Sequence, residues 1–233
     1  MIFRQLFDAE SSTYTYLIAD ETAGQAVLID PVIANTNDYL MLLEQLQLTL
    51  VVAMDTHTHA DHITALGLLR EKTGCRTMLG EQAVATCVTG NFSDGDIIHV
   101  GGLQIKALYT PGHTNDSYSF YVSDDKQPML FTGDTLLIRG TGRTDFQNGD
   151  ASQQYHSLFG VLLTYPDQTL VYPGHDYRGW TMSTVAEERA NNPRLQVSDE
   201  QVYIELMGDL KLPNPALMDV AVTANQACGN IND

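Results

Sequence analysis

The sequence predicts one α/β domain in which mixed β-sheets are flanked by helices. Short segments rich in β-branched and aromatic residues alternate with segments whose apolar residues recur at helical spacing. The chain of 233 residues has no internal repeat, no low-complexity tract and no linker. A single domain over 1–233, with a short helical and irregular extension from about residue 193, is therefore the simplest organisation.

The first third of the chain is predicted to alternate strands with helices. The expected strands are 1–7, 13–20, 25–32 and 48–54, and the expected helices are 35–48 and 62–74. The segment LTLVVAM, residues 48–54, is an unbroken apolar run of strand length, which is typical of a strand buried on both faces. A loop rich in histidine follows that strand directly.

The rest of the chain is predicted to be mainly β between residues 95 and 138 and mainly helical afterwards. Strands are expected in GDIIHV, LQIKALYT, SYSFYVSD, PMLFTGDTLLI and TLVYPGH. Helices are expected over 150–164, 181–191 and around 198–209, with an irregular segment to follow.

Charge and composition exclude several functions. The chain has 12 Lys+Arg against 29 Asp+Glu, a net charge of −17, which argues against nucleic acid and anionic membranes as partners. No window approaches the roughly 20 apolar residues of a membrane span, and the N-terminal segment lacks the pattern of a signal peptide. Cys75, Cys87 and Cys228 show no CxxC pair or disulfide framework, so a reducing compartment and a cytoplasmic location are expected.

Metal-binding residue types gather in four turns, each of which follows an apolar, strand-like segment. The turns are THTHADH (56–62), TPGHT (110–114), FTGDT (131–135) and YPGHD (172–176). They hold five of the seven histidines, and their candidate metal-site residues are His57, His59, Asp61, His62, His113, Asp134 and His175. Glycines at 112, 133 and 174 suit close turns. Imidazoles and carboxylates crowded in this way predict a metal site, and zinc, iron and manganese all accept such ligands.

The spacing HxHxDH at 57–62, followed by His113, Asp134 and His175, resembles the metallo-β-lactamase superfamily. That resemblance implies an αββα sandwich, two mixed β-sheets flanked by helices. The segments THADHITALGLL, LLIRGTGRTDFQNGDA and YPGHDYRGWTMSTVAEERANNPRL are similar to persulfide dioxygenases, also called sulfur dioxygenases, and so is the closing MDVAVTANQACG. These enzymes lie in the glyoxalase II-like branch of the superfamily.

The resemblance implies a single Fe(II) per chain, held by His57, His113 and Asp134. Two histidines and one carboxylate form a facial triad that leaves positions open for substrate and oxygen. The other residues of the turns are then expected to orient the ligands, and these are His59, Asp61, His62 and His175. Two zinc ions remain an alternative, because every ligand of the two-metal pattern is present.

The activity implied is oxidation of glutathione persulfide by O2 and water to sulfite and glutathione. Tyr177, two residues after His175, is expected to donate a hydrogen bond to the bound substrate. Glutathione carries carboxylates, and the arginines that lie in the motif segments and are expected to bind them are Arg139, Arg143 and Arg178. Arg189 is expected to be structural, and the resemblance allows a homodimer.

Two alternative functions have different signatures. A glyoxalase II-like thioesterase would use two zinc ions to hydrolyse S-lactoylglutathione. Those enzymes carry a longer helical region after the residue that matches His175, which favours the dioxygenase. A metal-binding module without catalysis is the third alternative, and the complete ligand set disfavours it.

Overall fold

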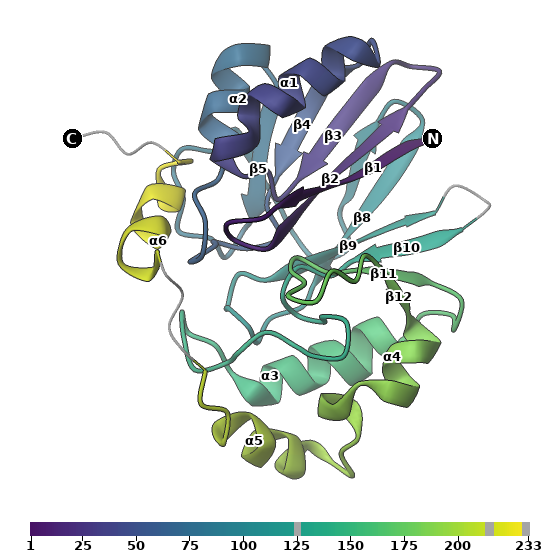
Figure 1. The fold of residues 1–233 in the computed structure, drawn as a ribbon, viewed down its shortest axis with the longest axis vertical. Helices are drawn as coiled ribbons and strands as arrows, with labels where there is room; N and C mark the ends of the chain where they lie inside the picture. Colours follow the sequence, from purple (N-terminus) through teal and green to yellow (C-terminus); the bar gives the residue numbers. More distant parts are fainter. Residues whose placement is uncertain (124–126, 213–216, 230–233) are drawn as a thin grey trace. The chain divides into compact units, whose positions relative to one another are not determined.

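A computed structural model describes residues 1–123, 127–212 and 217–229 (Figure 1). The chain divides into two compact units. Unit 1 comprises Met1–Phe92, Ile97–Ile105 and Asn214–Asp233, and unit 2 comprises Ser93–Asp96 and Lys106–Pro213. Unit 1 holds the first β-sheet, unit 2 holds most of the second, and each unit has its own helices. Within the described ranges, every helix is too short or too polar to cross a membrane.

The sheet of unit 1 has six strands in the order in which they occur along the chain. The strands are β1 (Ile2–Asp8), β2 (Thr13–Asp20), β3 (Gln25–Ile29), β4 (Thr49–Met54), β5 (Arg76–Gly80) and β6 (Gly90–Phe92). β1, β2 and β3 pair antiparallel, whereas β3 to β6 pair in parallel. Both faces of β2, β3 and β4 are largely buried, as the unbroken apolar run in β4 predicts.

Two helices of unit 1 cover one face of this sheet (Figure 1). They are α1 (Thr36–Gln45), which follows a 3-10 turn at Ile33–Asn35, and α2 (Leu66–Thr73). Tyr39 and Leu43 from α1 and Leu66 and Leu69 from α2 join the same apolar cluster as Leu28 of β3. α2 ends at Gly74, which adopts a left-handed conformation (φ 73°) and donates its N–H to Arg70 O.

The second sheet runs in the order β12-β11-β10-β9-β8-β7. Its strands are β7 (Ile97–Val100), β8 (Leu103–Tyr109), β9 (Tyr118–Ser123), β10 (Pro128–Phe131), β11 (Leu170–Tyr172) and β12 (Ser183–Thr184). The sheet is mixed, because β10 is parallel to β11 but antiparallel to β9. The chain passes from unit 1 into unit 2 along β8.

The helices of unit 2 pack in an apolar cluster that includes Leu130, Leu158, Val171 and Tyr203. They are α3 (Ala151–His156), α4 (Val185–Asn191), α5 (Glu200–Gly208) and the 3-10 turn Pro193–Leu195. Residues 150–164 were expected to be one helix. They form α3, a π-helical turn over Ser157–Val161 and a 3-10 turn over Leu162–Thr164.

The predicted class of two mixed sheets flanked by helices is confirmed, but several elements differ. The strand expected over 128–138 ends at Phe131, because Gly133 (φ 48°) begins the turn that presents Asp134. The helix expected from residue 181 begins only at Val185, since Ser183 and Thr184 pair with β11. β5 and β6 were not predicted. Residue 124 of the expected strand SYSFYVSD lies outside the described residues.

The segment expected to be irregular after residue 209 contains α6 (Met218–Gln226), which belongs to unit 1. Residues 213–216 and 230–233 of that segment lie outside the described ranges. The expectation of no disulfide is also wrong: Cys87 and Cys228, 141 residues apart in sequence, are bonded. Cys75 is free and buried, as expected of a structural cysteine.

Candidate metal centre

The histidine loop, residues 55–62, begins at the carboxyl end of β4 and is buried within unit 1. His57, His59 and His62 are each at most 2% exposed. The ring centroids of His57 and His59 lie 4.1 Å apart, and those of His59 and His62 lie 4.2 Å apart. One ligand atom each of His59, Asp61 and His62 lies within 4.8 Å of the others. The sequence-predicted cluster is therefore a cluster in space.

Asp30, at the end of β3, orients two of these rings. Its carboxylate accepts hydrogen bonds from Thr56 N (2.6 Å) and Thr56 Oγ1 (3.0 Å). Because the Thr56 hydroxyl gives its proton to Asp30, it accepts one from His57 Nδ1, 3.0 Å away, and His57 Nε2 keeps a lone pair. His59 Nε2 donates to Asp30 Oδ1 at 3.1 Å, which leaves His59 Nδ1 as the nitrogen with a lone pair.

Asp30 was not among the site residues predicted from the sequence, although it is the last residue of the strand segment QAVLID. Burial raises the pKa of Asp30, an effect that the hydrogen bonds from Thr56 oppose. His62 has a different partner: its Nδ1 lies 2.9 Å from Asp61 Oδ2 and 3.3 Å from Thr13 Oγ1. Each ring of the loop is thus fixed by a neighbour that determines which nitrogen can bind a metal.

In unit 2, three strand ends bring His113, Asp134 and His175 together. They follow β8, β10 and β11 respectively. His113 Nε2 lies 3.5 Å from Asp134 Oδ2, and His175 Nε2 lies 3.5 Å from Asp134 Oδ1. Ligands of a common ion with bonds of about 2.1 Å lie roughly 3 to 3.4 Å apart. Within the described residues, Asp134 Oδ1 is buried and accepts no hydrogen bond, which fits an oxygen that binds a cation.

The GTGR loop, residues 140–143, orients His113. His113 Nδ1 lies 2.8 Å from Arg143 O, and a carbonyl only accepts, so Nδ1 carries the proton and Nε2 keeps its lone pair. Gly142 permits this approach, because a Cβ there would lie 2.7 Å from His113 Nδ1 and 2.4 Å from Asp134 O. The loop is itself tied to the ligand turn, since Gly142 N donates to Asp134 O at 2.6 Å.

Glycines in the other turns also allow neighbouring segments to pack closely against the backbone. A Cβ at Gly174 would lie 2.7 Å from Asp134 Oδ1, and one at Gly112 (φ 133°) would lie 2.3 Å from the Gln154 backbone nitrogen. The expected role of these glycines is confirmed. Within each unit, the histidine and carboxylate side chains are of the types that bind metal ions, and the glycines allow the turns to pack closely around them.

Tyr177 and Arg178 lie on the exposed HDYRGW loop. The Tyr177 side chain is 74% exposed, and its ring stacks on His175 with a centroid distance of 6.1 Å. Asp176 shapes the loop by accepting hydrogen bonds from the backbone N–H groups of Arg178 and Trp180, both at 2.7 Å. Arg178 Cζ lies 5.7 Å from the centroid of the Trp180 ring.

The other predicted arginines have acidic partners. Arg139 forms an ion pair with the fully buried Glu188, donates to Ser183 Oγ at 3.0 Å and lies over the Trp180 ring at 5.5 Å. Arg143 binds Asp145 with two hydrogen bonds of 2.6 and 2.8 Å. Arg189, expected to be structural, pairs with Asp167 and donates to Leu163 O.

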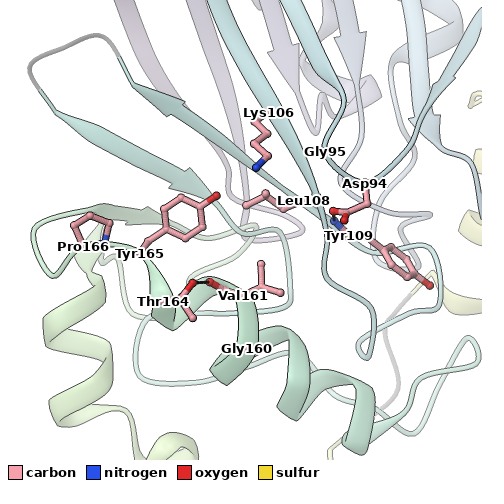
Figure 2. A pocket seen from close by; sticks show the side chains of 10 residues that line it. All are labelled: Asp94, Gly95, Lys106, Leu108, Tyr109, Gly160, Val161, Thr164, Tyr165 and Pro166. Atoms are coloured by element: carbon pink, nitrogen blue, oxygen red, sulfur yellow. Dashed lines mark hydrogen bonds between the residues drawn. The ribbon is translucent and has the colours of Figure 1, made fainter.

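A cavity of about 380 Å³ in unit 2 lies apart from these residues (Figure 2). It is lined by β8, by Asp94 and Gly95, and by the end of the π-helical turn with the segment that follows it, and Lys106, Leu108 and Tyr165 are among its walls. None of the residues predicted to bind metal or substrate lines it.

Comparison with known proteins agrees with the sequence motifs. A family model described as the metallo-beta-lactamase superfamily matches residues 9–85 and 88–175, which include residues of both units. The crystal structure of ETHE1 from Myxococcus xanthus is 53% identical, with a TM-score of 0.95, and the match covers 99% of this chain and 100% of that one.

Two curated relatives bear on the activity. The human mitochondrial persulfide dioxygenase ETHE1 is 45% identical over 98% of this chain and 89% of its own length. A probable hydroxyacylglutathione hydrolase from Schizosaccharomyces pombe is 34% identical over only 70% of this chain and 64% of its own. The chain therefore belongs to the metallo-β-lactamase superfamily and, within it, to the persulfide dioxygenases.

Proposed function

We propose that this protein oxidises glutathione persulfide with O2 and uses one Fe(II) per chain. The overall reaction converts the persulfide, O2 and water into glutathione, sulfite and two protons. The near full-length likeness to persulfide dioxygenases carries the proposal. We assign the iron to His57, His113 and Asp134, two histidines and one carboxylate. Bound Fe(II) would supply a redox-active centre with open positions for the substrate sulfur and O2.

The hydrogen bonds within each unit support this ligand set. His57 and His113 each have Nδ1 committed to an oxygen, so each offers Nε2 to a metal. Asp134 has a carboxylate oxygen that accepts no hydrogen bond among the described residues. Each of the three residues therefore has an atom that is suited to bind a metal ion.

The remaining histidines and carboxylates support the ligands in our proposal. Asp61 Oδ2 already accepts a hydrogen bond from His62 Nδ1, and His59 is held by Asp30. His175 faces Asp134 and stacks on Tyr177, so it can orient the carboxylate. These contacts give each residue a role without a second ion.

Substrate recognition is assigned to the HDYRGW loop. Arg178 is exposed and held against Trp180, which presents its guanidinium group to a carboxylate of glutathione. We assign to the exposed Tyr177 a hydrogen bond from its hydroxyl to the persulfide. Arg139 and Arg143 remain candidate contacts for glutathione, and their ion pairs with Glu188 and Asp145 fix the loops that carry them.

Single substitutions test the ligand assignment. His57→Ala, His113→Ala and Asp134→Ala should each abolish iron retention in protein purified without oxygen. His59→Ala and His62→Ala should keep much of the iron. Equal loss of iron from His62→Ala and His57→Ala would contradict the single-iron assignment.

The second candidate is a two-zinc thioesterase acting on S-lactoylglutathione, which the likeness to the probable hydroxyacylglutathione hydrolase favours. Hydrolysis of that thioester by the zinc-loaded protein, without any uptake of O2, would support it. A cytoplasmic location and a homodimer remain predictions, and light scattering in solution tests the second.

A further inference from the structure

Asn225, in the last turn of α6, binds the backbone of the histidine loop from a distant part of the sequence. Its Nδ2 donates to His59 O at 2.9 Å and to His62 O at 2.8 Å. Its Oδ1 accepts a hydrogen bond from Thr64 N at 2.9 Å. The side chain is 2% exposed. One carboxamide thus forms three hydrogen bonds with the main chain of the segment that carries the predicted metal-binding residues.

These bonds satisfy backbone groups of the loop that lie outside any strand or helix. The loop has left β4 and has not yet entered α2, so its buried carbonyl groups lack the partners that a strand or helix would supply. A buried carbonyl without a donor costs about 1–3 kcal/mol. A carboxamide satisfies two such carbonyls and one N–H at once, whereas an apolar residue of the same size satisfies none.

The end of α6 is itself held firmly against unit 1. The Cys87–Cys228 disulfide lies three residues beyond Asn225. Cys228 O accepts a hydrogen bond from Gly67 N of α2 at 2.9 Å. Gly229 (φ 82°) lies so close to the loop that a Cβ there would be 2.1 Å from Thr64 O. Asn225 therefore lies just before residues that are held against unit 1 by a disulfide, a hydrogen bond and a close backbone contact.

We propose that Asn225 is a positioning residue for the metal centre: it fixes the backbone of the histidine loop and thereby the directions of the His59 and His62 rings. The inference rests on the proposed role of this loop in metal binding, but not on the identity of the metal or the reaction. It assigns to α6 the task of fixing a loop that lies more than 160 residues earlier in the chain.

Two substitutions separate hydrogen bonding from packing. Asn225→Asp keeps the size and the acceptor for Thr64 N but removes both donors. Asn225→Ala removes the whole group. Gln226→Ala, at the exposed neighbouring position of the same helix, is the matched control. Three readouts do not depend on catalysis: hydrogen exchange of the amides of 55–66 in metal-free protein, Co(II) affinity, and the visible absorption spectrum of the Co(II) form.

We expect Asn225→Asp and Asn225→Ala to speed amide exchange in 55–66, to weaken Co(II) binding by about 10- to 100-fold and to change the Co(II) spectrum. Gln226→Ala should stay within about twofold of the wild type in affinity. Wild-type exchange, affinity and spectrum in Asn225→Asp would overturn the proposal. If neither variant folds, the wild type still decides: slow exchange of the Asn225 side-chain amide protons supports the proposal, and solvent-like exchange contradicts it. These readouts remain interpretable even if the protein does not oxidise persulfide, because none of them measures catalysis.

Discussion

The ring of His113 donates its Nδ1–H to the backbone carbonyl of Arg143, 2.8 Å away, so the GTGR loop orients a ligand from another turn. A substitution changes the side chain and leaves the backbone carbonyl in place. The orientation of the His113 ring therefore depends on how closely the GTGR loop approaches it. Gly142 sets that approach, with His113 and Asp134 on either side of its missing Cβ.

Gly142→Ala should displace the GTGR loop and weaken iron binding by about 10- to 100-fold, because the added Cβ collides with His113 and with the Asp134 backbone. Gly140→Ala is the matched control, since its Cβ would make an ordinary contact of 3.9 Å with Leu137. Iron titration under anaerobic conditions measures both. Unchanged affinity in Gly142→Ala would show that the loop yields without moving His113.

Arg139 and Arg178 should differ in what their removal changes. Arg139→Ala leaves the buried Glu188 carboxylate without its ion pair and should cost about 3 kcal/mol of unfolding free energy. Arg178→Ala, at an exposed position, should leave stability within about 0.5 kcal/mol and raise KM for glutathione persulfide about tenfold. Denaturant unfolding and steady-state kinetics on both variants test the split. A raised KM in Arg139→Ala together with lost stability in Arg178→Ala would mean that Arg139 binds substrate and Arg178 stabilises the fold.

The Cys87–Cys228 disulfide should stabilise the protein against unfolding. Because it closes a loop of 141 residues, its loss should cost about 2–4 kcal/mol. Urea unfolding of the wild type with and without a phosphine reductant measures the cost, and Cys87→Ser should match the reduced wild type and not respond to reductant. Equal stability of oxidised and reduced wild type would show that the bond contributes nothing.

Tyr203 of α5 should make stability fall in alkali. Its hydroxyl donates to Gln154 Oε1 at 2.7 Å, and Gln154 Nε2 donates to Gly142 O at 3.2 Å, so the tyrosine supports the GTGR loop. Burial raises the pKa of Tyr203 to about 12 from its ordinary value of 10.0. The folded protein therefore keeps the proton that the unfolded chain releases.

The contribution of Tyr203 is fully present below pH 10 and is lost as the pH rises towards 12, by up to about 2–3 kcal/mol. Tyr203→Phe should make the unfolding free energy less dependent on pH in this window. Unfolding curves at pH 8 and pH 11 for both proteins measure the difference. Parallel losses in the two proteins would exclude Tyr203 as the cause.

The sequence predicted the four turns because their signals are local: an apolar strand is followed by histidine or aspartate, with a glycine just before that residue in three of the four turns. Asp30 and Asn225 were missed because their partners are far along the chain, 26 residues from Asp30 to Thr56 and 163 from Asn225 to His62. The Cys87–Cys228 bond has no signal in its spacing. β5 and β6 are short strands in the parallel part of the first sheet, and α6 is a helix of only nine residues.

Oxygen uptake by protein purified and loaded with iron anaerobically tests the central claim most directly. On addition of glutathione persulfide, we expect about one iron per chain to support consumption of one O2 and formation of one sulfite per persulfide. Two zinc ions per chain, hydrolysis of S-lactoylglutathione and no O2 uptake would contradict the account.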